Sequence, residues 1–106
     1  NPPGYVFGIV WPILYVLMSI SAFRTFEITK NTFLAQLFFN TIWSWLFFSF
    51  HMPLLALLNI WFLIFLNIKL LIQMINLDKL SGIIYIPYVV WLFFASYLNL
   101  FIVINN

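Results

Sequence analysis

The chain has 106 residues, of which 66% are hydrophobic and only 6% are charged. A soluble domain carries about 25% charged residues. The four basic and two acidic residues of this chain therefore cannot cover a surface that faces water, and the composition predicts an integral membrane protein. A net charge of +2 is too small to indicate nucleic-acid binding, and the absence of cysteine excludes disulfides and thiolate chemistry.

Long apolar runs predict four transmembrane helices in one all-α domain that covers residues 1–106. The first run, 6–23, follows two prolines and a glycine, and the second, 32–50, follows a polar stretch. A proline opens the third run, 54–75, and the fourth run is 83–104. Barrel strands alternate apolar and polar residues, whereas these runs are continuous, so helices are expected.

The basic residues predict how the helices are oriented in the membrane. Arg24, Lys30 and Lys79 fall in the two connections 24–31 and 76–82, which lie on one side of a four-helix bundle. The positive-inside rule places that side in the cytoplasm of a bacterium. A bacterial cell membrane is therefore expected, with the mitochondrial outer membrane as the alternative. The acidic residues of these connections are expected to be solvated.

Three of the predicted helices each carry aromatic rings and a few hydrogen-bonding groups along one face. Asn and Trp side chains on such faces bond across helices in many membrane proteins, which is the packing interpretation. The alternative is a pocket for a flat apolar ligand, because such pockets are mainly apolar with sparse polar groups. The residues of the three faces are Phe7 or Gly8, Trp11, Tyr15, Met18, Gln36, Asn40, Trp43, Ser44, Phe47, Tyr88, Trp91, Ala95, Leu98 and Asn99.

Other polar residues have simpler interpretations. Asn59 and Asn67 are expected to bond neighbouring helices, and Tyr85 and Tyr88 are candidates for the aromatic belt at the membrane interface. His51, the only histidine, is interpreted as a polar turn residue, with an axial haem ligand as the alternative. No metal site is predicted. The chain has no carboxylate pair or nucleophile–base pair on which hydrolysis or phosphoryl transfer depends.

Three segments, PPGYVFGIVWPILYVLM, FFNTIWSWLFF and IPYVVWLFFASYLN, occur in the order and spacing that resemble the translocator protein / tryptophan-rich sensory protein family (TspO/MBR). The resemblance implies a five-helix membrane protein, commonly a homodimer, that binds porphyrins, haem-related tetrapyrroles, sterols and synthetic aromatic compounds. It implies that this chain corresponds to helices two to five, with the first helix and a lid loop missing. Expected partners are thus the lipid bilayer, a hydrophobic small molecule and a second copy, without a covalent cofactor.

The resemblance also implies site residues. Trp11 matches the tryptophan implicated in porphyrin photodegradation. The expected ligand-binding set is Phe7, Gly8, Val10, Trp11, Asn40, Trp43, Phe47, Leu55, Trp91, Ala95 and Leu98. Leu55 stands where the animal proteins have a pocket tryptophan, and Ile104 stands where the sterol motif has arginine, so sterol binding through that motif is not expected.

These observations predict a receptor or sensor that binds a tetrapyrrole and regulates or transports it. Two alternatives stay open. One is an enzyme that degrades porphyrin in light and oxygen through Trp11, and the other is a structural membrane subunit without a ligand.

Overall fold

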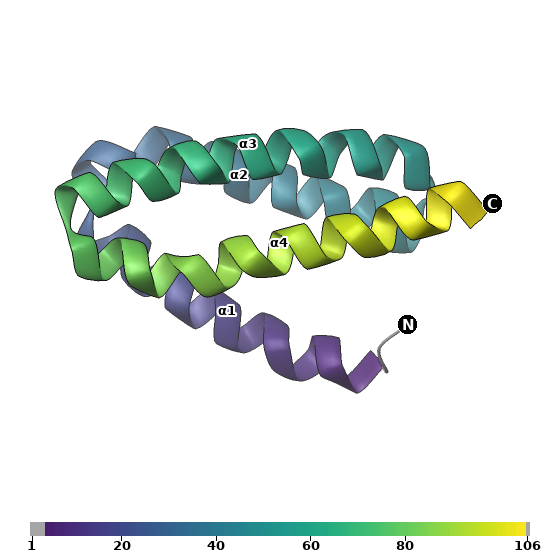
Figure 1. The fold of residues 1–106 in the computed structure, drawn as a ribbon, viewed down its shortest axis with the longest axis horizontal. Helices are drawn as coiled ribbons and strands as arrows, with labels where there is room; N and C mark the ends of the chain where they lie inside the picture. The colour runs from purple at the N-terminus through teal and green to yellow at the C-terminus, as the bar shows by residue number, and fades with distance from the viewer. Residues whose placement is uncertain (1–3, 106) are drawn as a thin grey trace.

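The computed structural model describes residues 4–105, with side chains from residue 8 onward. The elements in chain order are α1 (Gly4–Arg24), α2 (Phe26–Ser44), the π-helical segment η1 (Trp45–Ser49), α3 (Pro53–Leu77) and α4 (Lys79–Asn105). They form an elongated helical bundle, and no strand occurs within the described range (Figure 1). The all-α prediction is confirmed.

Two of the helices meet the requirements for crossing a bilayer by length and hydropathy. These are α3, with 25 residues, and α4, with 27. The apolar part of α1 that has described side chains is shorter, Gly8–Arg24. The bundle is 42 Å long, which matches the 40–45 Å of a bilayer with its headgroup regions.

The helices extend further into the polar connections than the sequence predicts. Helix α2 begins at Phe26 rather than at residue 32, so the first connection is reduced to Thr25. Helix α4 begins at Lys79 rather than at residue 83, and Asp78 alone separates it from α3. The physical reason is that backbone N–H groups near a membrane need hydrogen-bond partners within the protein. Even in the two connections, the amide of Thr25 bonds Ala22 O and the amide of Asp78 bonds Met74 O.

His51 lies in the wider turn between α2 and α3, as its interpretation as a turn residue predicts. The chain leaves α2 through η1, where the amide of Phe50 bonds Trp45 O at 2.8 Å, five residues back. His51 then takes a positive φ of 52°, a left-handed conformation that is uncommon for residues other than glycine. Pro53 occupies the first helical position of α3, where its missing N–H has no consequence.

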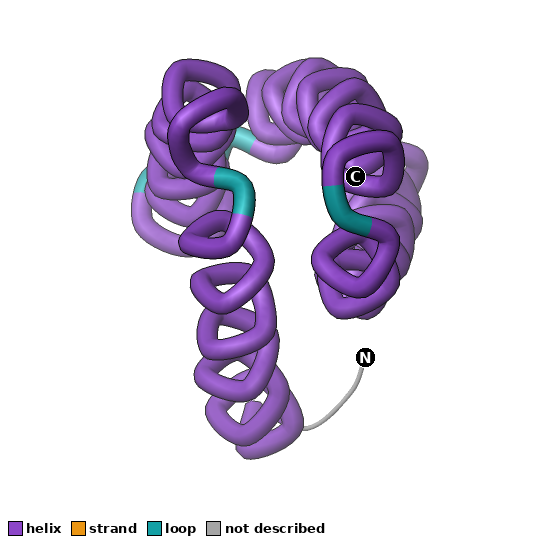
Figure 2. The backbone as a smooth tube through the Cα atoms, turned by 90° about the vertical axis from the view of Figure 1, so that its left-hand side faces the viewer, coloured by secondary structure: helices purple, strands orange, loops and turns teal. Residues whose placement is uncertain are grey.

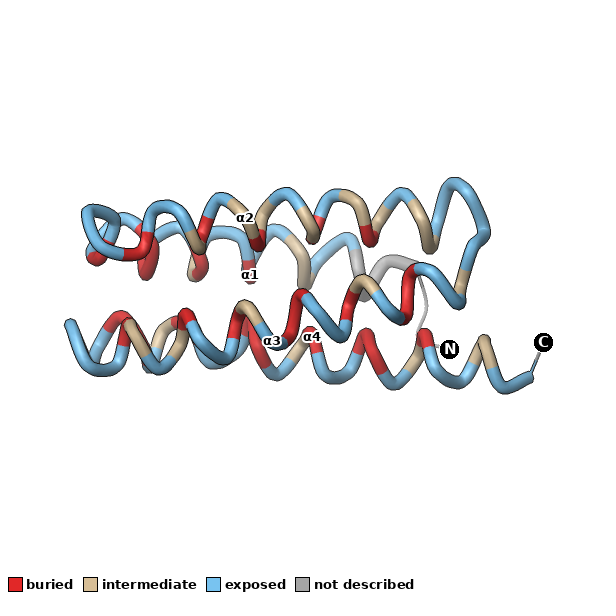
Figure 3. Tube along the Cα trace, turned by 90° about the horizontal axis from the view of Figure 1, so that it is seen from above, coloured by how far each residue is buried: buried red, intermediate tan, exposed pale blue. Residues whose placement is uncertain are grey.

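Helix α4 holds the bundle together because it packs on both α1 and α3, while α2 packs on α3. Each helix buries one face toward its neighbours and leaves the other face exposed (Figure 3). The connections at Thr25 and Asp78 lie at one end of the bundle, opposite the C-terminus, and α1 diverges from α4 toward its own N-terminus (Figures 1 and 2). The two connections therefore share one side, as the sequence predicts.

At Gly82, α4 lies close against the end of α3. A Cβ placed on this buried residue would lie 3.0 Å from the Cα of Ile75 and would overlap its Cγ1. Overpacking of this kind destabilises by about 1–3 kcal/mol. We expect Gly82→Ala to lower the unfolding midpoint of the detergent-solubilised protein, followed by helical circular dichroism during heating.

Gly8→Ala is the matched control for this experiment. No heavy atom lies within 4 Å of a Cβ placed on Gly8, so the added methyl group meets open space. Equal midpoints for Gly82→Ala and Gly8→Ala would contradict the close helix contact.

Candidate functional site: a buried polar network and an aromatic cluster

A hydrogen-bonded network of polar side chains, contributed by all four helices, occupies the centre of the bundle. The hydroxyl of Tyr15 donates to Oδ1 of Asn40 at 3.0 Å, and the amide of Asn40 donates to the hydroxyl of Tyr88 at 2.7 Å. Tyr88 donates in turn to Oε1 of Gln36 at 2.8 Å. These bonds connect α1, α2 and α4.

The network continues into α3 through Asn67. The amide of Asn67 donates to Oε1 of Gln36 at 3.1 Å and to the carbonyl of Leu63 at 2.8 Å, and the hydroxyl of Tyr85 donates to Oδ1 of Asn67. We call the six side chains of these two paragraphs the polar network: Tyr15, Gln36, Asn40, Asn67, Tyr85 and Tyr88.

Nearly all of the polar network is inaccessible to solvent or lipid. Gln36, Asn40, Asn67, Tyr85 and Tyr88 are each at most 1% exposed. Tyr85 and Tyr88 are therefore core residues, and the prediction that they belong to an interfacial belt is wrong. Their i, i+3 spacing on the face that also carries Trp91 was the signal for burial. Because buried polar groups in a membrane must find partners within the protein, the network favours one arrangement of the four helices.

A second feature, the aromatic cluster, lies where α1 meets α4. Trp11 stacks on Tyr15 with ring centroids 5.6 Å apart and meets Trp91 edge-on at 5.9 Å. Trp91 also contacts Phe94 at 5.3 Å. Trp11 and Trp91 are half-buried, and Tyr15 and Phe94 are each 38% exposed. The four rings thus present accessible surface beside one end of the polar network. The hydroxyl of Tyr15 connects the cluster to that network through its bond to Asn40.

Trp43 belongs to a separate aromatic group near η1. Its ring stacks on Phe47 at 5.0 Å with an interplanar angle of 14°. Its indole N–H donates to Oδ1 of Asn99 at 3.0 Å, and the amide of Asn99 donates to the carbonyl of Pro53 at 2.8 Å. These two hydrogen bonds link the end of α2 and the start of α3, which flank η1, to α4. Asn59, as predicted, also bonds a neighbouring helix, through the carbonyl of Phe39.

The structure brings some of the expected ligand-binding residues together and separates others. Trp11 and Trp91 are in contact, and Asn40 is joined to them through Tyr15. The remaining members are more scattered. Ala95 is buried, Val10, Phe47 and Leu98 are half-buried, Gly8 and Leu55 are exposed, and the side chain of Phe7 lies outside the described residues.

The end of the bundle that holds the short connections carries an ion pair. Nη2 of Arg24 lies 2.7 Å from Oδ2 of Asp78, and the hydroxyl of Ser81 donates to the same oxygen at 2.6 Å. These two hydrogen bonds, that of Arg24 foremost, hold the pKa of Asp78 below its usual range. The Asp78 side chain is 30% exposed, as expected for a solvated carboxylate, and it also pairs with Arg24, which the sequence did not predict.

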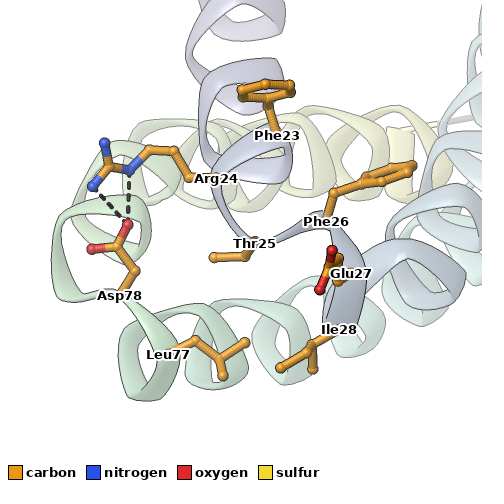
Figure 4. Close-up of a pocket in the computed structure, with 8 residues that line it drawn as sticks. All are labelled: Phe23, Arg24, Thr25, Phe26, Glu27, Ile28, Leu77 and Asp78. Carbon is orange, nitrogen blue, oxygen red and sulfur yellow. Dashed lines mark hydrogen bonds and ion pairs between the residues drawn. The ribbon is translucent and has the colours of Figure 1, made fainter.

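An open cavity of about 400 Å³ lies beside this ion pair (Figure 4). Its lining residues come from the C-terminal end of α1, the first turn of α2 and the C-terminal end of α3. They are Phe23, Arg24, Thr25, Phe26, Glu27, Ile28, Leu77 and Asp78. None of them belongs to the expected ligand-binding set, so this cavity is distinct from the aromatic cluster.

These features define a helical membrane protein whose polar core is internally bonded and in which two tryptophans, Trp11 and Trp91, meet at a boundary between helices. The sequence profile of the TspO/MBR family matches residues 1–104. The chain belongs to this family, which confirms the resemblance drawn from the three sequence segments.

Individual relatives agree with the family assignment. Protein CrtK of Rhodobacter capsulatus is 34% identical over 92% of this chain and 67% of its own length. A tryptophan-rich sensory protein of Cereibacter sphaeroides is 32% identical over 93% of this chain and 66% of its own length. The tryptophan-rich protein TspO of Archaeoglobus fulgidus is 35% identical over the whole chain and 73% of its own length. The chain thus spans about two thirds of the length of such relatives.

The polar network gives a direct test on stability. Tyr88→Phe removes the acceptor of the Asn40 amide and one donor to Gln36. Hydrogen bonds between membrane helices contribute about 0.6–2 kcal/mol each, so we expect a loss of about 1–2 kcal/mol in unfolding free energy, measured by denaturant titration in mixed micelles.

Tyr97→Phe is the matched control, since Tyr97 lies on the same helix and is 63% exposed. A loss of stability of the same size in both variants would show that the buried hydroxyl of Tyr88 has no special role.

Proposed function

We propose that this protein is a membrane receptor or sensor for a flat hydrophobic ligand, of which porphyrins and haem-related tetrapyrroles are the expected class. The observation that carries the proposal is the aromatic cluster. It offers four ring surfaces, two of them tryptophan, at a boundary between helices. Family membership supports a sensor-type membrane protein, and two relatives bear names that refer to tryptophan or sensing.

The chemistry of the cluster suits such a ligand. Aromatic side chains interact with other π-systems in offset-stacked or edge-on arrangements, and a tetrapyrrole offers a large flat face for such contacts. The Tyr15 hydroxyl donates its one hydrogen to Asn40, so its oxygen is an acceptor for an N–H or O–H group on the ligand. In this proposal Trp11 and Trp91 contact the ring system, and Asn40 orients the hydroxyl of Tyr15.

The deeper polar groups have a different task in this proposal. Gln36, Asn67 and Tyr85 are bonded to one another and to Tyr88, so they hold the helices in place rather than contact the ligand. On the same helix faces, some polar residues therefore bond neighbouring helices, while others line the proposed ligand site.

The proposal includes the membrane arrangement. Helix α1 has 21 residues, and α2 with η1 continues from residue 26 to 49, lengths that suffice for the roughly 30 Å hydrocarbon core. We therefore propose four crossings of a bacterial cell membrane, with the connections at Thr25 and Asp78 in the cytoplasm and a homodimer as the assembled form.

Protoporphyrin IX titrated into the detergent-solubilised protein tests ligand binding, followed by the shift of the porphyrin absorbance band. We expect saturable binding, and Trp91→Leu should weaken it about threefold to tenfold because an aromatic contact contributes about 0.5–1.5 kcal/mol beyond its buried area.

The matched control is Trp45→Leu, since Trp45 is 60% exposed on η1 and contacts Phe50 rather than the cluster. The proposal fails if no saturable binding occurs, or if Trp91→Leu and Trp45→Leu bind the porphyrin equally.

A second candidate function is the degradation of porphyrin in light and oxygen. The observation that favours it is the position of Trp11, an oxidisable indole in contact with the rings of Tyr15 and Trp91. Under illumination in air, Trp11→Phe should abolish porphyrin consumption while binding is largely kept. Equal consumption by wild type and Trp11→Phe, measured against protein-free porphyrin, would remove this candidate.

A further inference from the structure

We propose that the cavity beside the Arg24–Asp78 ion pair binds the headgroup of a zwitterionic phospholipid that carries a primary ammonium group. The proposal concerns a different place from the aromatic cluster and does not depend on tetrapyrrole binding. It depends on the shape, charges and location of the cavity.

Both signs of charge line the cavity. Figure 4 shows the Arg24–Asp78 pair at one side and Glu27 at the other, with Thr25 between them. A purely anionic headgroup would meet two carboxylates, and a purely cationic one would meet a guanidinium. A zwitterion places an opposite charge against each side, so the lining complements it.

The Arg24 guanidinium keeps donors for a phosphate group. Its Nε is shared between Oδ2 of Asp78 and the hydroxyl of Ser81, and its Nη2 pairs with Asp78. Its Nη1 bonds no residue in the part of the chain that the structure describes. Guanidinium groups carry five N–H donors and bind phosphate oxygens well. The ion pair therefore orients Arg24 without using all of its donors.

Glu27 supplies the negative side. It forms no ion pair and no hydrogen bond with any described residue, and it lies in the exposed first turn of α2. A carboxylate accepts hydrogen bonds from a primary ammonium, which has three donors. A quaternary ammonium has none, so Glu27 distinguishes the two kinds of headgroup.

The remaining lining indicates a lipid rather than a soluble zwitterion. Phe23 is 84% exposed, and Phe26, Ile28 and Leu77 are exposed as well. These apolar side chains border the cavity at the end of the bundle, where a membrane protein meets the boundary between headgroups and acyl chains. Acyl chains that run down from the cavity would cover them.

Native mass spectrometry of the full chain tests the proposal. The protein is exchanged into mixed micelles that hold equal amounts of phosphatidylethanolamine, phosphatidylcholine and phosphatidylglycerol with identical acyl chains. We expect phosphatidylethanolamine to be retained about two- to fivefold above each of the other two lipids, the range that exposed charge pairs provide.

Glu27→Gln should reduce retention of phosphatidylethanolamine to the level of phosphatidylcholine, whereas Lys30→Gln, a change outside the cavity lining, should leave the preference intact. The proposal is overturned if phosphatidylglycerol is retained at least as well as phosphatidylethanolamine in the wild type. It is also overturned if no lipid is preferred, if Glu27→Gln keeps the preference, or if Lys30→Gln removes it as fully as Glu27→Gln does.

Discussion

The requirement that polar groups inside a membrane bundle find partners within the protein governs this structure. Two tyrosines, two asparagines and a glutamine are almost completely buried, and each bonds another member of the polar network. In hydrocarbon the alternative is an unsatisfied group, which costs several kcal/mol. Helices with smooth apolar surfaces could slide or rotate past one another, whereas these helices keep their bonds only in one register.

The positions of the other features depend on this network. Tyr15 brings α1 to α2 by its hydroxyl and carries its ring into the aromatic cluster. Trp91 lies three residues after Tyr88 on α4, so the bond from Asn40 to Tyr88 also fixes where Trp91 meets Trp11. A ligand at the cluster would thus contact rings whose positions are set by hydrogen bonds deeper in the bundle.

Much of the fold follows from the sequence because continuous apolar runs have few other solutions in a membrane. The helix starts were harder to predict. Residues 26–31 are polar enough to suggest a connection, yet they form the first turns of α2. The ends of membrane helices extend into the headgroup region, where polar residues are compatible with helix, so hydropathy alone misplaces the boundary.

The candidate site could be predicted in part. Helical spacing placed Trp11, Asn40 and Trp91 on inward faces, and they do lie together. Spacing within one helix contains no information about which neighbour a face meets. The pairing of Tyr85 with Asn67 and of Arg24 with Asp78 joins residues far apart in the chain, and only the helix arrangement shows it. Leu55 is expected in the site from the family resemblance alone, and its side chain is exposed.

In the proposed function, the polar network stays in place and the ligand binds at its edge, next to Tyr15. Nitrogen-15 NMR of the side-chain amides of the asparagines and Gln36, recorded during a protoporphyrin IX titration, tests this arrangement. We expect the Asn40 amide resonance to shift until the protein is saturated, while the Asn67 amide resonance stays in place. A ligand that saturates the protein while Asn40 is unchanged, or that shifts Asn67 as much as Asn40, would contradict it.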